Sequence, residues 1–232
     1  MNIKKLQNEW QPKVFKNNPT FPFIVIDNWY NANEEKAVWK ELELYTTLPR
    51  DKIDRAENTV VAKDRQGKPK SNAFRFYVDG IYTNEGKKYS PILNCLYKLS
   101  TEKFDSLVNE CKPYCRSFFS ANQYGTLVSY YENDDHYEAH YDSCQWTLCV
   151  WFVKDRELFT GGDFYLPESN NLIKLKHNRA VFFPSCFLHK VTPVKFNKEP
   201  ETIGYGRFTI TTFLNFVNDG TIIKRSSEYN DT

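Results

Sequence analysis

Two histidines and one aspartate have the types and the spacing that suit a metal ion. His140 and Asp142 are separated by one residue, and His189 follows 47 positions after Asp142. Two imidazoles and one carboxylate can occupy one face of an octahedral metal and leave three positions open, as in sites where Fe(II) activates O2. We therefore expect His140, Asp142 and His189 to be both the metal ligands and the catalytic residues.

The spacing of the first pair has a structural reason. Side chains alternate between the two faces of a strand, so a strand over residues 137–142 would point His140 and Asp142 the same way and Tyr141 the other way. The third ligand must then come from a distant strand. The two remaining histidines, His136 and His177, fall outside this pattern, and we expect no direct role for them.

A basic residue follows at a spacing that suits an anion. Arg207 lies 18 positions after His189 and opens the alternating segment 207–211, so Thr209 and Thr211 share its face. A guanidinium group matches a carboxylate in a bidentate manner. We expect this face of the strand to be the one that carries the metal site.

The order of these segments resembles that of the 2-oxoglutarate/Fe(II) dioxygenases, and among them the prolyl 4-hydroxylase type. The resemblance covers roughly residues 120–216, with a weaker match from Phe21. Each segment alone is a weak signal, and the combination is strong. The matching segments are 137–142, 161–166, 180–184, 189–194 and 207–211.

The resemblance implies roles for particular residues. Arg207 would bind the distal carboxylate of 2-oxoglutarate, with the Thr209 hydroxyl beside it. Tyr130 and Tyr137 match tyrosines that line the co-substrate pocket, although they could equally be core aromatics. Fe(II), 2-oxoglutarate and O2 would be required, and ascorbate is the expected reductant. Because Asp142 keeps a carboxylate on the metal, halogenation is disfavoured.

Three departures from the family pattern affect these assignments. The gap between His189 and Arg207 is lengthened by residues 196–204, which makes Lys195 and Lys198 alternative anchors for the carboxylate. Some relatives place a pocket tyrosine near residues 151–152, where this chain has Trp151, which we expect to wall the substrate cleft. The glycines at 161–162 are expected to serve a turn that needs positive φ or close packing.

The expected reaction is hydroxylation of a C–H bond, with succinate and CO2 as co-products. Its most favoured form is 4-hydroxylation of a peptidyl proline, with residues 49–72 as a mobile flap over the substrate or as a plain solvated loop. A free amino acid, a small metabolite or a nucleic-acid base is the alternative substrate. Base-demethylating relatives carry a second Arg where this chain has Phe213, which argues against that branch. A non-catalytic jelly-roll binding module is the third possibility.

Composition gives further bounds. The 232 residues carry a formal net charge of +2, which gives no strong reason to expect nucleic acid as a partner. The six cysteines are expected to be free thiols in a reducing compartment, and Cys111 with Cys115 lacks the second pair that a zinc site needs. No signal peptide or membrane span is recognisable, so we expect a cytoplasmic protein. The oligomeric state stays open.

The predicted fold class is β-rich α+β, a double-stranded β-helix (jelly roll) of about eight strands with supporting N-terminal helices. We expect one domain over residues 1–232, with N-terminal support over 21–119, a core over about 120–216 and a polar tail over 217–232. Helices should begin near Asn31 or Asn33, at Ser90 and at Thr101. The expected core strands are 124–131, 137–142, 147–153, 162–166, 172–175, 180–183, 190–194 and 207–216.

Overall fold

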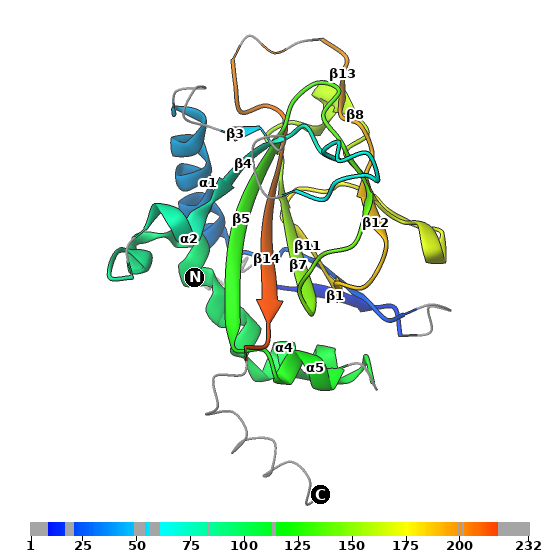
Figure 1. Ribbon diagram of the computed structural model, residues 1–232. Helices are drawn as coiled ribbons and strands as arrows, with labels where there is room; N and C mark the ends of the chain where they lie inside the picture. Colours follow the sequence, from blue (N-terminus) through cyan, green and yellow to red (C-terminus); the bar gives the residue numbers. More distant parts are fainter. Residues whose placement is uncertain are drawn as a thin grey trace, which may run out of the picture.

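The computed structural model describes residues 9–16, 21–48, 54–55, 61–82, 84–112, 115–198, 200 and 202–217. Within these ranges the strands form an eight-stranded sheet, a four-stranded sheet and a two-stranded sheet, all antiparallel (Figure 1). The fold is thus β-rich, and the predicted jelly-roll class is confirmed. The predicted tail lies outside the described residues except for Val217, as do residues 49–53 and 56–60 of the predicted flap.

The large sheet carries Arg207 and Thr209, two of the residues expected to bind an anion. Its strands run in the order β1-β2-β11-β7-β14-β5-β4-β3. Strand β7 is buried along its whole length because both of its faces are covered. The bounds are β1 Gln11–Val14, β2 Ile24–Asp27, β3 Asp54–Arg55, β4 Phe74–Tyr77, β5 Gln123–Tyr131, β7 Trp146–Phe152, β11 Arg179–Pro184 and β14 Arg207–Asn215.

The small sheet covers one face of the large sheet. Its order is β10-β9-β12-β6, with β6 at Tyr137–His140, β9 at Phe164–Leu166, β10 at Asn171–Ile173 and β12 at His189–Val191. A second, two-stranded pair joins β8 (Phe159–Thr160) to β13 (Lys195–Phe196). A buried apolar cluster that includes Trp151, Phe164 and Phe183 fills the space between the two larger sheets.

All eight predicted core strands are present, as β5, β6, β7, β9, β10, β11, β12 and β14. Four of them come from the large sheet and four form the small one, which is the double-stranded arrangement expected of a jelly roll. Strands β2 and β4 extend the large sheet beyond these core strands. The missed strands β1, β3, β8 and β13 have only two to four residues, too few to show a period-2 pattern.

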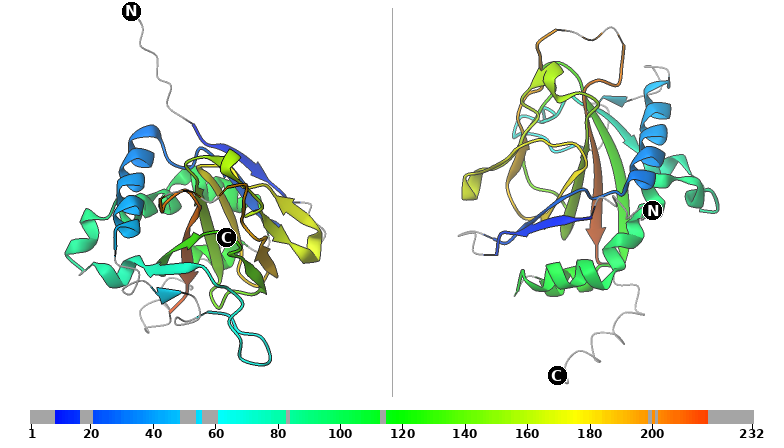
Figure 2. Two further views of the ribbon diagram at one scale, coloured as in Figure 1. Left: turned by 90° about the horizontal axis from the view of Figure 1, so that it is seen from above. Right: turned by 180° about the vertical axis from the view of Figure 1, so that it is seen from behind.

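Helices cover the opposite face of the large sheet (Figures 1 and 2). Helix α1 (Ala32–Thr46) begins with a capping box in which the Asn31 side chain accepts from the Glu34 amide and the Glu34 carboxylate accepts from the Asn31 amide. Ser90 and Thr101 cap α3 (Pro91–Asn94) and α4 (Glu102–Asn109) as predicted. The short helices α2 (Val78–Ile81), η3 (Gly86–Tyr89), η4 (Cys95–Ser100) and α5 (Cys115–Phe119) complete this side, and η5 (Arg156–Leu158) and η6 (Pro167–Ser169) lie between strands.

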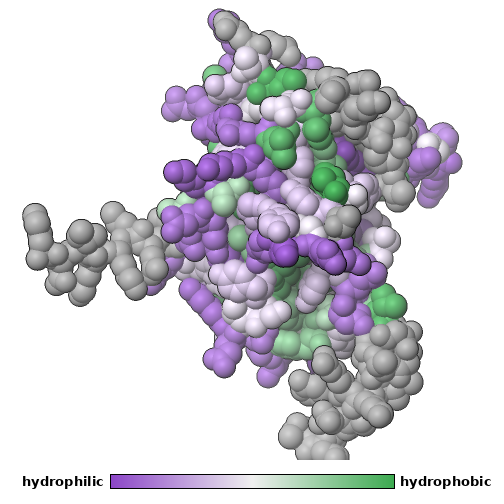
Figure 3. Space-filling model, turned by 90° about the vertical axis from the view of Figure 1, so that its left-hand side faces the viewer, coloured by the Kyte–Doolittle hydropathy of each residue, from purple (hydrophilic) through white to green (hydrophobic). Residues whose placement is uncertain are grey.

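These helices bury one apolar cluster against the sheet, and that cluster holds the even-numbered residues of β7, such as Leu148 and Val150. The outer surface on the side of α1 and α2 is mainly hydrophilic, with hydrophobic side chains in smaller groups (Figure 3). Among the described residues, no helix combines the length and the apolar character needed to cross a membrane. The odd-numbered residues of β7 face the small sheet, and this is the side on which the candidate site lies.

Candidate functional site

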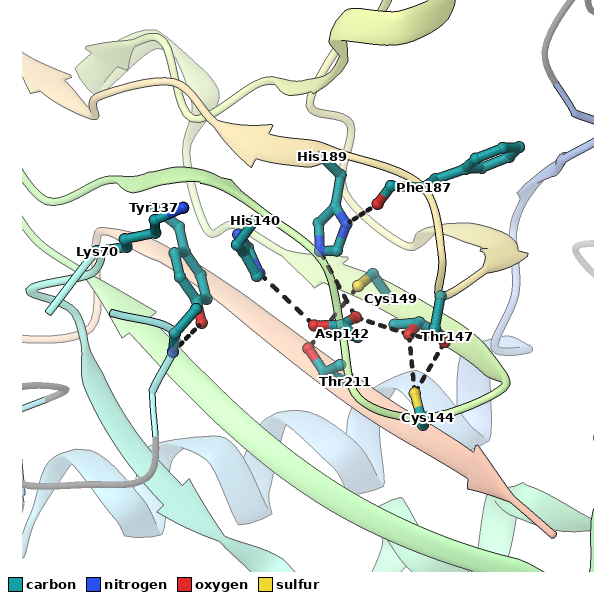
Figure 4. Close-up of polar contacts among 12 residues, drawn as sticks. Lys70, Tyr137, His140, Asp142, Cys144, Thr147, Cys149, Phe187, His189 and Thr211 are labelled. Atoms are coloured by element: carbon teal, nitrogen blue, oxygen red, sulfur yellow. Dashed lines mark hydrogen bonds and ion pairs between the residues drawn. The ribbon is translucent and has the colours of Figure 1, made fainter. Parts of the chain in front are cut away.

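The three predicted ligands meet between the two larger sheets (Figure 4). His140 ends β6 and His189 begins β12, and the two residues are directly paired across these strands. Asp142 Oδ1 lies 3.6 Å from His140 Nε2, and Asp142 Oδ2 lies 3.5 Å from His189 Nε2. One donor atom from each residue lies within 4.8 Å of the others, so a single metal ion could contact all three.

The route by which Asp142 reaches the site differs from the prediction. Strand β6 ends at His140, so Asp142 lies two residues beyond the strand rather than within it. Its backbone N–H donates to Ser185 O at 3.2 Å, which holds the chain beside the end of β11. Tyr141 turns outward and is 56% exposed, as expected. The alternation of side chains thus continues past the end of the hydrogen-bonded ladder.

Backbone carbonyl groups orient both imidazole rings. His140 Nδ1 lies 2.8 Å from Glu138 O, and His189 Nδ1 lies 2.9 Å from Phe187 O. A carbonyl oxygen only accepts, so Nδ1 carries the proton in the neutral form of each ring, and Nε2 is the atom left to bind a metal. Both rings are therefore held in the tautomer that a metal ligand requires.

The protonation states also suit a cation. Burial lowers the pKa of His189 to about 4, so its ring is neutral at pH 7. Burial alone would raise the pKa of Asp142, but the neighbouring histidines and the hydrogen bond from Thr147 outweigh it, and the pKa is lowered. A neutral imidazole and an ionised carboxylate are the forms that bind metals.

A buried guanidinium group lies on the same side of the large sheet. Arg207 is fully buried on β14, its Nη1 donates to Thr209 Oγ1, and its Nε and Nη2 have no partner among the described residues. Its Cζ lies 4.8 Å from the Tyr131 ring centroid and 5.5 Å from that of Trp151. Burial lowers the pKa of Arg207 below its ordinary value. A buried cation with unsatisfied donors requires an anion.

One cavity joins the ligand triad to this guanidinium group. The residues around it come from β4, β5, β6, β7, β9, β12 and β14, with Asp142 between β6 and β7. Thr209 and Thr211 line it beside Arg207, so the face predicted for the strand at 207–211 is confirmed. The lining residues are Arg75, Ser129, Tyr131, Tyr137, His140, Asp142, Cys149, Phe164, His189, Val191, Arg207, Thr209, Thr211 and Phe213.

Of the two tyrosines predicted to line the pocket, the structure brings only Tyr137 there. The Tyr137 ring stacks on His140 with centroids 3.5 Å apart. Tyr130 instead faces the helices, where it packs on Phe208 and its hydroxyl accepts from the backbone N–H groups of Gly204 and Gly206. The prediction for Tyr130 is therefore wrong by one position. The neighbouring residue, Tyr131, lies on the face of the strand that borders the cavity.

The alternative anchors lie elsewhere. Lys195 is exposed on β13 and pairs with Asp134, and Lys198 is also exposed, so neither lysine lines the cavity. Trp151 is fully buried and does not wall an open cleft, contrary to expectation, because its ring lies against the Arg207 guanidinium. His177 lies 3.0 Å from Glu35 near helix α1, outside the cavity.

The glycine pair behaves as predicted. Gly161 and Gly162 have φ values of +72° and +67°. A Cβ on Gly161 would lie 1.8 Å from Pro193 O, and a Cβ on Gly162 would lie 3.0 Å from Arg207 Cδ. The turn therefore requires glycine both for its backbone conformation and for its close approach to the guanidinium stem.

Besides Tyr131, sequence reasoning missed two residues that contribute to this site. Arg75 on β4 borders the cavity, and its Cζ lies 5.8 Å from the Tyr137 ring centroid. Thr147 on β7 donates to Asp142 Oδ2. The alternation of β7 with Cys149 and Trp151 could have placed Thr147 on the site face, but no sequence pattern links Arg75 to the metal ligands.

Residues 126–215 match the family model of the 2OG-Fe(II) oxygenase superfamily. A prolyl-4-hydroxylase from Pseudomonas putida has a similar structure (TM-score 0.56, 12% identity, 87% of this chain and 96% of that one). So has a Trichoplax adhaerens prolyl hydroxylase in complex with a hypoxia inducible factor peptide fragment (0.56, 16%, 85% and 84%). A viral collagen prolyl hydroxylase from Paramecium Bursaria Chlorella virus-1 gives 0.50 and 15%, with 84% and 96% covered. A search of the curated proteins finds no match.

The family match over residues 126–215, the fold and the His-Asp-His cluster together are similar to those of the 2-oxoglutarate/Fe(II)-dependent dioxygenases. Its fold is similar to that of solved prolyl hydroxylases. The family implies Fe(II) and 2-oxoglutarate, with O2 as the second co-substrate. The residues present fit both groups, because the donor set suits Fe(II) and the unsatisfied Arg207 guanidinium suits a carboxylate.

Proposed function

We propose that this enzyme hydroxylates C4 of a proline within a peptide segment of another protein. In this proposal His140, Asp142 and His189 hold Fe(II), while Arg207 and Thr209 bind the distal carboxylate of 2-oxoglutarate. Ascorbate would keep the iron reduced. One cavity supports this assignment most directly. It joins the three possible metal ligands to the buried guanidinium group of Arg207, two of whose nitrogen atoms have no hydrogen-bond partner among the described residues.

The protein's own contribution is ligation, orientation and exclusion of water. When bound, iron with 2-oxoglutarate and O2 supplies the oxidising power for C–H hydroxylation, with succinate and CO2 as co-products. The carbonyl groups of Glu138 and Phe187 fix the two imidazole rings, and Thr147 fixes the carboxylate. Arg207 and Thr209 would orient the co-substrate along the cavity. The apolar walls formed by Phe164, Val191 and Phe213 keep water from the reacting atoms.

Part of the predicted flap lies beside strand β6, which ends at the expected ligand His140. Lys70 Nζ donates to Ala139 O at 2.6 Å, and Glu138 N donates to Lys70 O at 2.8 Å. Ala62 N donates to the Tyr137 hydroxyl at 3.2 Å, which joins the start of the segment to the ring stacked on His140. These contacts support residues 61–72 as the segment that borders a bound peptide.

The peptide class rests on likeness of fold. The solved structures with this fold include prolyl hydroxylases, and one of them is in complex with a peptide fragment. A free amino acid, a small metabolite or a nucleic-acid base is the alternative substrate. The single-domain organisation over residues 1–232 and a cytoplasmic location stay predictions.

The test is succinate formation from 2-oxoglutarate with Fe(II) and ascorbate. The assay compares a proline-rich peptide with the same peptide in which alanine replaces each proline, for the wild type and for His140→Ala. We expect turnover with the proline peptide only, loss of turnover in the variant, and one added oxygen atom that product hydrolysis identifies as 4-hydroxyproline.

Other outcomes separate the parts of the proposal. Turnover that is stimulated only by amino acids, small metabolites or nucleic-acid bases would keep the reaction class and reject the peptide substrate. Turnover that survives in His140→Ala would reject the assigned ligands. Arg207→Met should raise the KM for 2-oxoglutarate without weakening metal binding, and an unchanged KM would reject Arg207 as the anchor.

A further inference from the structure

Residues 62–70 form a short β-hairpin, named here the basic hairpin. Lys63 pairs with Pro69 across it, and Asp64 N donates to Lys68 O at 2.9 Å. The Asp64 side chain in turn accepts from Lys68 N at 2.8 Å. The basic hairpin therefore has a defined shape, and its one carboxylate is already bound by its own backbone.

The basic hairpin holds a concentration of positive charge. It contains three lysines, one arginine and one aspartate, a net charge of +3, whereas the whole chain carries +2. Lys63, Arg65 and Lys68 are exposed, and none of the three forms an ion pair with another described residue. Glu138 on β6 is also exposed, but its carboxylate lies 3.9 Å from His136 Nε2. The three cations are therefore open to an anionic partner.

The base of the basic hairpin lies at the open edge of the small sheet. Strand β6 is the last strand of that sheet, and Ser71 pairs there with Tyr137. Lys70 Nζ donates to Ala139 O at 2.6 Å, next to the expected ligand His140. From this base the basic hairpin extends away from the sheets, as the cyan segment seen from above (Figure 2). The exposed cations thus lie on a projection that starts beside the cavity.

The length of the basic hairpin suits an extended peptide. A strand rises about 3.3 Å per residue, so Lys68 and Arg65 lie roughly 7 and 16 Å along the hairpin from Lys70. An extended peptide spans a similar distance in about two to five residues. A peptide that places its proline at the cavity and runs beside the basic hairpin would bring the side chains at that separation close to these cations.

We propose that the basic hairpin binds acidic side chains of the peptide substrate. The preferred target is then a proline with Asp or Glu about two to five residues away, since carboxylates complement such a row of cations. This inference rests on the proposed function, because it takes a peptide to be the substrate. It adds a sequence preference that likeness of fold does not supply.

A nucleic acid is the other kind of polyanion that a basic hairpin could bind. Three exposed cations neutralise few phosphates, and a net charge of +2 is far from that of a clearly basic domain. The attachment of the basic hairpin to the edge of β6 favours an extended peptide that runs on into the cavity.

The test is succinate formation with two proline peptides that differ only in the flanking residues. One peptide carries Asp and Glu, and the other carries Asn and Gln at the same positions. The wild type should have a KM about three- to tenfold lower for the acidic peptide, because several exposed ion pairs each contribute little. Replacing all three exposed cations, by Lys63→Gln, Arg65→Gln and Lys68→Gln, should bring the ratio of the two KM values close to one.

The control variant removes three exposed lysines from the helical side of the large sheet, by Lys36→Gln, Lys40→Gln and Lys88→Gln. It has the same net charge as the hairpin variant and should keep the wild-type KM ratio. A second readout needs no variant. Raising the salt concentration to about 0.5 M should bring the wild-type ratio toward one, since salt screens exposed charges.

Equal KM values for the two peptides in the wild type, or a ratio that survives in the hairpin variant, would overturn the inference while the proposed function stands. Binding of a labelled single-stranded oligonucleotide that is lost only in the hairpin variant, together with equal KM values, would assign the basic hairpin to nucleic acid instead. No turnover of either peptide would reject the proposed function and the inference with it.

Discussion

Thr147 Oγ1 donates to Asp142 Oδ2 at 2.7 Å, so a β7 hydroxyl holds the carboxylate that faces both histidines. Thr147 is fully buried, and its hydroxyl also lies 2.9 Å from Ser185 Oγ. Asp142 follows the end of β6 and has no strand ladder of its own. The hydrogen bond from Thr147 therefore fixes the one ligand that the sheet does not fix.

Thr147→Val should weaken metal binding about 10- to 100-fold, because the methyl group that replaces the hydroxyl cannot orient Asp142. Titration with Co(II), followed by visible absorption, measures this affinity without turnover. Thr147→Ser keeps the hydroxyl and should bind Co(II) within a few-fold of the wild type. Equal affinities for Thr147→Val and the wild type would show that Asp142 needs no support from β7.

Lys70→Met should weaken the attachment of the segment 61–72 to strand β6. Its Nζ donates to Ala139 O at 2.6 Å, and methionine keeps the length of the side chain without the donor. We expect faster hydrogen exchange at the amides of Ala62 and Glu138, which bridge the segment and β6. Lys68→Met in the exposed turn of the same segment is the control and should leave these rates unchanged. Unchanged rates in Lys70→Met would show that the backbone bonds alone hold the segment.

The sequence predicted the strands well where the pattern was long. Strand β7 is apolar at almost every position, and β14 alternates over its first five residues, so both were expected near their observed bounds. The residues Tyr130 and Tyr131 show the limit of such reasoning. Two adjacent tyrosines point to opposite faces, and only the pairing of Tyr131 with Arg207 decides which one borders the cavity.

The site was predictable to the extent that its residues lie on regular strands. His140, His189 and Arg207 are strand residues, and the structure brings all three to one cavity. Arg75 could not be foreseen, because it reaches the cavity only through the pairing of β4 with β5. Trp151 was expected at an open cleft, yet the small sheet covers it, and covering by a distant sheet leaves no local signal in the sequence.

Glu41→Leu should lower the free energy of unfolding by about 3 kcal/mol. The buried Glu41 carboxylate accepts hydrogen bonds from Ser90 Oγ and Ile92 N at the start of α3, and from the hydroxyls of Tyr45 and Tyr82. Leucine would leave these donors buried without an acceptor. Chemical denaturation measures the loss, and Glu41→Gln, which keeps an acceptor oxygen, should lose about half as much. An unchanged free energy of unfolding in Glu41→Leu would mean that water satisfies the donors.

Arg179→Met should lower the free energy of unfolding at pH 7 by on the order of 1 kcal/mol. This difference between the variant and the wild type should disappear in acid. Hydrogen bonds from Arg179, assisted by Lys176, lower the pKa of Asp27. A lowered carboxyl pKa adds stability above the ordinary value near 4 and loses it as pH falls through the folded-state value. Denaturation midpoints of the variant and the wild type should therefore converge below about pH 4. Lys195→Met, in an exposed pair, should show no such convergence, and a constant gap for Arg179→Met would contradict the linkage.

Gly162→Ala should weaken 2-oxoglutarate binding about tenfold and leave metal affinity unchanged. The added Cβ would lie 3.0 Å from Arg207 Cδ, 3.2 Å from Leu175 Cδ2 and 3.3 Å from Val194 Cγ2, so the guanidinium stem is the part that must shift. The φ of +67° adds backbone strain that is separate from this contact.

Gly67→Ala is the matched control for that strain. Gly67 has a φ of +81°, yet a Cβ there meets nothing within 4 Å. Backbone strain should therefore lower the thermal stability of both variants by a similar amount. Only Gly162→Ala should change the affinity for 2-oxoglutarate, measured with Zn(II) bound. Equal affinities in the two variants would show that the Arg207 guanidinium adjusts to the methyl group, and that the close packing of the turn serves the fold rather than the anion site.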